Sequence, residues 1–124
     1  MKIAASIARI LLGLIFFIFG LNGFLNFIPA GTLPSGLAGQ FLTVLLRSHY
    51  GLFVSAFELA GGALLLVNRY VPLALTILGP VIVNILCFHI FMNHEGLPMA
   101  IVVAALALFL LWRYRTNFAG LVKP

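Results

Sequence analysis

The chain has 124 residues, of which 64% are hydrophobic and only 7% charged, and its formal net charge is +5. This composition excludes a water-soluble domain, because soluble proteins need a polar surface and are roughly 25% charged. We expect no nucleic-acid partner, since the bases are scattered at segment ends and form no patch with interleaved aromatic residues. The single cysteine, Cys87, excludes an intrachain disulfide and a thiolate metal cluster. The sequence therefore indicates an integral membrane protein.

A helix needs about 20 residues to cross a hydrocarbon core of about 30 Å. Four apolar segments meet this measure, and no ten-residue stretch alternates between polar and apolar residues as a membrane strand would. The predicted fold class is all-α, an antiparallel four-helix bundle that forms a single transmembrane domain over residues 1–124. The predicted helices span residues 3–27, 50–67, 71–92 and 97–112.

Residues 36–47, between the first two predicted helices, show helical periodicity of their own. The polar residues Gln40, Thr43 and Arg47 recur at helical spacing, opposite an apolar face that includes Leu37 and Phe41. This segment is too short to span a membrane, so we expect an amphipathic helix that lies in the outer interface or covers the bundle as a lid. We expect the C-terminal tail, residues 116–124, to fray.

The distribution of basic residues predicts the topology. Only Arg47 falls on the side of the long connection, and the other six bases fall on the opposite side: Lys2, Arg9, Arg69, Arg113, Arg115 and Lys123. Because cytoplasmic loops carry the excess of Lys and Arg, both termini and the turn at residues 68–70 are predicted to be cytoplasmic.

The stretch "SAFELAGGALLLV" places one acid, Glu58, inside the second apolar helix. Glu58 shares a helix stripe with Gly51, Ser55 and Gly62, and small residues let another backbone approach closely, so we expect the acid to point into the bundle. It lies about 12 Å from the outer end of its helix. No Lys or Arg lies at its depth, so we expect a largely protonated acid that donates a hydrogen bond. It would bind a polar head group such as a quinone carbonyl, or carry a proton; a purely structural bridge is the alternative.

Two amides lie at similar depth in other helices. Asn22 is near the outer end of the first helix and Asn84 is about 12 Å from the outer end of the third, so the three polar side chains could meet. Asn26, one turn beyond Asn22, would extend the polar stripe toward the outer surface. With Glu58 and Ser55, these are the candidate ligand-binding or proton-carrying residues. The alternative is that the amides make only structural hydrogen bonds between helices.

Three histidines, His49, His89 and His94, all fall on the outer side in this topology and are the candidate ligands for a metal or haem. No two of them lie deep in separate helices, so we expect interfacial histidines with no ligand role. His89 follows Asn84 by five residues, about 140° round the helix, and is expected on a different face. We therefore expect neither a metal site nor a tightly bound cofactor.

Several stretches resemble the DoxX-like family of small bacterial four-helix membrane proteins. They are "RILLGLIFFIFGLNGFLNFIP", "FELAGGALLLVNRYVPLALTILGPVIVNILCFHIF" and "LFLLWRYR", and together they cover most of the chain. The resemblance implies a bacterial cytoplasmic membrane, and a role as a small subunit linked to quinone-reducing oxidoreductases or to complexes that handle oxidative stress. It also implies that Asn22, Glu58 and Asn84 are the family's polar positions. Many relatives carry a lysine at the position of Gly23. The resemblance therefore implies no cation at this position for binding an anionic ligand.

Three functions remain open at this point. The first is a non-catalytic accessory subunit that binds a quinone or lipid near Glu58 while a redox partner protein supplies the electron-transferring centre. The second is a small proton-coupled transporter that uses Glu58, and the third is a membrane scaffold without a ligand. We expect no enzymatic activity from the chain alone, membrane lipids as its surroundings, and an oligomeric state that the sequence does not define.

Overall fold

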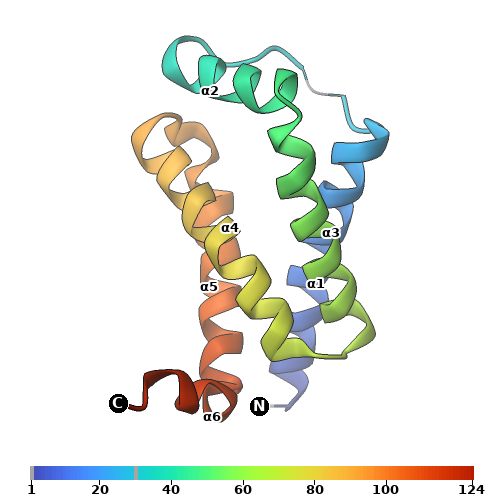
Figure 1. Cartoon of the computed structure of the whole chain (residues 1–124), viewed down its shortest axis with the longest axis vertical. Coiled ribbons are helices and arrows are strands. Elements are labelled where there is room, and N and C mark those ends of the chain that lie inside the picture. Colours follow the sequence, from blue (N-terminus) through green and yellow to red (C-terminus); the bar gives the residue numbers. More distant parts are fainter. Residues whose placement is uncertain (1, 30) are drawn as a thin grey trace.

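The computed structural model of the protein describes residues 2–29 and 31–124. Four long apolar helices dominate it (Figure 1), namely α1 (Lys2–Leu25), α3 (Tyr50–Val67), α4 (Val71–Phe91) and α5 (Leu97–Arg113), the last preceded by the turn η1 (His94–Gly96). A shorter helix, α2 (Gly36–Arg47), joins α1 to α3. These elements confirm the predicted all-α fold, with four apolar helices of membrane length and a short helix between the first two.

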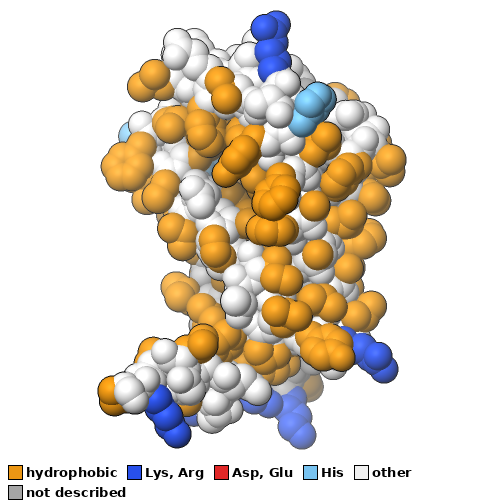
Figure 2. Space-filling view, viewed as in Figure 1, with side chains coloured by type: hydrophobic (Ala, Val, Ile, Leu, Met, Phe, Trp, Pro, Cys, Tyr) orange, Lys and Arg blue, Asp and Glu red, His pale blue; other side chains and the backbone are white. Residues whose placement is uncertain are grey.

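The four long helices pack in a ring in the order α1, α3, α4, α5, and α1 contacts α5 to close it. Both termini and the turn between α3 and α4 lie at one end of this ring, which we call the terminal end, whereas α2 crosses the opposite end (Figure 1). On the face shown in Figure 2, hydrophobic side chains cover the middle of the molecule and Lys and Arg side chains lie at the two ends. An apolar belt between two charged ends is the surface that an integral membrane protein needs.

The buried core occupies the terminal half and the centre of the bundle. Its largest fully buried side chains come from all four long helices and are Leu12, Phe16, Leu65, Leu78 and Leu110. In α4, the buried residues run from Val71 to Ile82, and none of the described residues after Ile82 is buried. α4 is therefore packed tightly toward the terminal end and loosely toward α2.

Glycines bring the backbones of α1 and α3 into direct contact. A Cβ atom on Gly20 would lie 2.8 Å from the Cα atom of Leu59 and 2.8 Å from the carbonyl oxygen of Ser55. Gly62 on α3 is packed in the same way against Gly13 and the backbone of α1 around it. Close approach through small residues is the usual basis of helix association in membranes, where burial of apolar surface gives little driving force.

The turn between α3 and α4 is tight, and a side chain from α1 holds it. Asn68 and Tyr70 both adopt left-handed backbone conformations, with φ of 57° and 53°. The guanidinium group of Arg9 donates hydrogen bonds to the carbonyl oxygens of Leu65 and Leu66, the latter at 3.4 Å. A cation at these carbonyls satisfies the unpaired acceptors at the C-terminus of α3 and complements the helix dipole.

The C-terminal tail was predicted to fray, and this prediction is wrong. After α5 the chain turns aside and continues as α6 (Arg115–Phe118) and η2 (Ala119–Val122). Tyr114 and Phe118 pack against the buried core and hold this segment to the terminal end. The predicted first helix was also two residues too long, because α1 ends at Leu25 and Asn26 already has a left-handed φ of 53°.

Candidate functional site

A cavity of about 370 Å³ lies in the loosely packed half, between α2, α3 and α4. Its polar lining comes from Tyr50, Glu58, Asn84 and His89. The rest of its wall is apolar and is formed by Phe41, Leu42 and Leu45 of α2, Phe53, Val54 and Phe57 of α3, and Pro80, Val81, Ile85 and Phe88 of α4. An apolar cavity with a few convergent polar groups is the usual form of a small-molecule site, and its volume falls in the range of about 300–1,000 Å³.

Glu58 is half-buried in the wall formed by α3. Ser55, one turn earlier on α3, faces α1 instead, where a Cβ atom on Gly23 would lie 2.5 Å from the Cβ atom of Ser55 and closer still to its Oγ atom. No Lys or Arg lines the cavity, and among the described residues none donates a hydrogen bond or offers an ion pair to the Glu58 carboxyl group. The carboxyl group is therefore free to bind whatever occupies the cavity.

Asn84 lies across the cavity from α3, and its side chain already makes one hydrogen bond within its own helix. Its side-chain amide donates a hydrogen bond of 2.8 Å to the carbonyl oxygen of Pro80. That bond leaves the Oδ1 atom of Asn84 as an acceptor and one amide hydrogen as a donor. Pro80 has no N–H of its own, so α4 lacks one backbone hydrogen bond beside this wall.

His89 also lines the cavity, which corrects the expectation that it lies on a different face from Asn84. The two residues are about 140° apart on α4, but the cavity spans a wide arc of the helix because α4 is loosely packed here. The Nδ1 atom of His89 is 3.0 Å from the carbonyl oxygen of Asn93, and its ring packs edge-on against Phe88. Since a carbonyl only accepts, Nδ1 carries the hydrogen and Nε2 is left as an acceptor.

The other predicted site residues lie outside this cavity. Asn22 accepts a hydrogen bond of 2.8 Å from the backbone N–H of Ile28, so it closes the end of α1. Asn26 is exposed in the following turn, and Ser55 is buried against α1. The structure therefore brings Glu58 and Asn84 to one cavity and leaves Asn22, Asn26 and Ser55 outside it.

The remaining histidines, His49 and His94, do not line this cavity. His49 precedes α3 in a left-handed conformation, and the Nε2 atom of His94, in η1, lies 2.6 Å from the carbonyl oxygen of Ile90 near the end of α4. Within residues 2–29 and 31–124, no three His, Cys, Asp or Glu residues are arranged to hold a metal ion.

Sequence reasoning missed the aromatic part of the site. The rings of Phe53 and Phe57 are 5.0 Å apart on α3, and Phe41 of α2 packs 5.6 Å from Phe88 of α4. The second contact places α2 over the outer mouth of the cavity, in agreement with a covering role for this helix. The spacing of four residues between Phe53 and Phe57 was the available signal, but it does not distinguish a cavity wall from a lipid-facing stripe.

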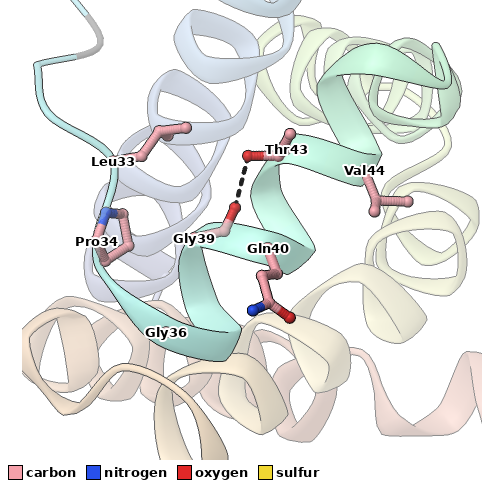
Figure 3. A pocket seen from close by; sticks show the side chains of 7 residues that line it. All are labelled: Leu33, Pro34, Gly36, Gly39, Gln40, Thr43 and Val44. Carbon is pink, nitrogen blue, oxygen red and sulfur yellow. Dashed lines mark hydrogen bonds between the residues drawn. The ribbon is translucent and has the colours of Figure 1, made fainter.

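A second hollow lies on the outer surface of α2 and is open (Figure 3). It is bordered by Leu33 and Pro34, on the segment leading into α2, and by Gln40 and Thr43 of the helix. The hydroxyl group of Thr43 already donates to the carbonyl oxygen of Gly39 at 2.7 Å. With no acid or base in its lining, this hollow offers less chemistry than the cavity beneath α2.

No protein-family model matches the chain, and comparisons with curated proteins and with solved structures likewise return no match. The assignment of function therefore depends on the cavity itself.

Proposed function

We propose that the cavity beneath α2 binds a neutral, lipid-soluble ring molecule of the quinone class, and that the protein is a non-catalytic accessory subunit of a membrane oxidoreductase. The observation that carries the proposal is the grouping of Glu58, Asn84 and His89 among aromatic rings at membrane depth. Aromatic walls favour a flat ring through stacked and edge-on contacts, while the polar groups fix its orientation.

The polar groups suit both redox forms of such a molecule. A protonated Glu58 would donate a hydrogen bond to a quinone carbonyl, whereas the free acceptors of Asn84 and His89 would take hydrogen bonds from the hydroxyl groups of a quinol. A site with donors and acceptors at hand holds the carrier before and after reduction.

Access from the lipid supports the same proposal. Phe53 is 63% exposed and Phe57 is 45% exposed, although both line the cavity. The cavity therefore reaches the surface of the bundle between α3 and α4, in the part of the molecule that hydrocarbon surrounds. A carrier dissolved in the bilayer would enter sideways, without crossing the polar interface.

The proposed electron-transferring partner and location follow from the resemblance to the DoxX-like family and from charge. The redox centre would belong to a partner protein, and the chain would hold its carrier. The terminal end, with most of the bases, would face the cytoplasm of a bacterial cell. This orientation would place the cavity in the extracytoplasmic half of the membrane.

One observation favours a second function. A cavity with five aromatic rings, a single acid and no Lys or Arg also suits a lipophilic cation, which would be attracted to the ring faces and to an ionised Glu58. The protein would then be a small proton-coupled transporter that exchanges the proton of Glu58 for its substrate.

Binding measurements in lipid nanodiscs separate the two functions. The probes are decylubiquinone, which is neutral, and tetraphenylphosphonium, which is a cation, each titrated against the whole protein by isothermal calorimetry. We expect saturable binding of decylubiquinone that Glu58→Gln weakens about three- to tenfold, since an amide still donates a hydrogen bond. The matched control is Glu95→Gln, which removes the other acid of the chain outside the cavity and should leave binding unchanged.

Two different results would contradict the quinone proposal. Absence of saturable decylubiquinone binding would refute the quinone proposal. Saturable binding of tetraphenylphosphonium that Glu58→Gln abolishes would support the transporter function in its place.

A further inference from the structure

The terminal end of the bundle is strongly and uniformly basic. Both acids of the chain lie in the other half of the molecule, Glu58 in the wall of the cavity and Glu95 in the turn η1. Arg9 is engaged with the end of α3. Five further basic side chains at this end are exposed, namely Lys2, Arg69, Arg113, Arg115 and Lys123. No acid offsets them, so this end attracts anions.

The C-terminal segment adds exposed apolar side chains beside these charges. Phe118 packs against the core, whereas Leu121 is 77% exposed and Val122 is 83% exposed. The segment turns away from the axis of α5 at the terminal end and projects sideways, away from the other long helices (Figure 1). Exposed apolar residues next to bases, in a segment that projects sideways from the end of a membrane bundle, are typical of a chain that lies in the lipid interface.

Trp112 marks the level of that interface. It is half-exposed near the end of α5, and the guanidinium carbon of Arg115 lies 4.7 Å from the centre of its ring. Arg115 also donates a hydrogen bond of 2.8 Å to the carbonyl oxygen of Trp112, which fixes the guanidinium group beside the ring. The remaining N–H groups of Arg115 are available to a phosphate, for which a guanidinium fork is well shaped.

We propose that the terminal end is a docking surface for anionic phospholipids. Leu121 and Val122 insert among the acyl chains at the interface, and the exposed bases, with Arg113, Arg115 and Lys123 nearest to that segment, contact the lipid phosphates. Charge complementarity selects this occupant, because five exposed bases without an acid match a surface of repeated phosphates. Two exposed apolar residues form too small a patch for the core of a stable protein interface.

The single tryptophan of the chain makes the proposal directly measurable. Trp112 serves as the energy donor to dansyl-labelled lipids in vesicles of phosphatidylcholine that contain the whole protein. One sample carries dansyl-phosphatidylglycerol, which is anionic, and the other dansyl-phosphatidylcholine, which is not. We expect the apparent affinity to be at least threefold higher for the anionic lipid at low salt, and the difference to disappear at high salt.

Variants identify which end of the molecule is responsible. Arg113→Gln combined with Lys123→Gln should remove most of the anionic preference, since each base near a membrane surface contributes roughly a fivefold factor to the lipid affinity. These side chains are exposed, so the double variant keeps the fold, and Arg115 is left in place to preserve the environment of Trp112. Arg47→Gln, which removes the one base at the opposite end, is the matched control and should change nothing.

Equal transfer to the two lipids in the unmodified protein would overturn the proposal and leave an acidic protein as the partner of this surface. An anionic preference that persists in the double variant would overturn it as well. Neither result bears on the cavity beneath α2, which lies in the other half of the bundle.

Discussion

Replacement of Gly20 with alanine tests the direct contact between the backbones of α1 and α3. The added Cβ atom would lie 2.8 Å from the Cα atom of Leu59 and 2.8 Å from the carbonyl oxygen of Ser55. Both are backbone atoms of α3, so no rotation of a side chain relieves the contact. The backbone nitrogen of Leu59 lies closer still, so the two helices must separate by more than about 0.6 Å to reach a tolerable 3.4 Å. Overpacking of this kind costs about 1–3 kcal/mol.

Gly79→Ala is the matched control, because nothing lies within 4 Å of a Cβ atom at Gly79 in α4. There the alanine only favours the helix, by about 0.5–1 kcal/mol. Unfolding by sodium dodecyl sulfate from dodecyl maltoside micelles, followed by far-ultraviolet circular dichroism, measures both variants. We expect Gly20→Ala to lower the free energy of unfolding by about 1–3 kcal/mol, and Gly79→Ala to leave it unchanged or raise it. Equal effects of the two substitutions would refute a direct backbone contact between α1 and α3.

Two further substitutions can be measured in the same way. Arg9→Gln removes the cation from the carbonyl oxygens at the end of α3 and should lower the free energy of unfolding by about 1–2 kcal/mol. The control Arg69→Gln, at an exposed turn, should change it by less than about 0.5 kcal/mol. Equal losses in the two variants would show that the net charge matters and that the contact of Arg9 does not. Asn22→Ala removes the acceptor for the N–H of Ile28 and should cost about 1 kcal/mol while decylubiquinone binding stays intact, so a loss of binding would return Asn22 to the site.

The long helices could be predicted because the bilayer imposes their length and apolarity. Spans of this kind are visible in composition alone, and the bounds of α3 match the prediction. The end of α1 was misplaced because a left-handed residue at Asn26 stops the helix while the sequence continues to be apolar. The segment α6 was missed because its order comes from Tyr114 and Phe118 packing on the core, a tertiary contact that leaves no periodic signal over so few residues.

The candidate site was partly predictable for a related reason. Depth along each helix follows from residue counting, and it placed Glu58 and Asn84 at the same level. Counting does not reveal which helices are neighbours or how widely they diverge. Asn22 has a suitable depth but binds the turn after its own helix, and His89 reaches the cavity only because α4 is loosely packed there. The aromatic walls could not be distinguished from lipid-facing rings without the arrangement of the helices.

The tight turn at residues 68–70 joins α3 and α4 at the terminal end, so the two helices form two arms that can pivot about this turn as a hinge. Glu58 lies nine residues, or about 14 Å, from the last residue of α3, and the start of α3 lies about 26 Å away from that point. A change of about 5° in the angle between the arms therefore shifts Glu58 by about 1 Å and the far tip by about 2 Å. A small change in the angle between α3 and α4 at the turn is thus amplified into a larger change in the width of the cavity opening at the other end of these helices.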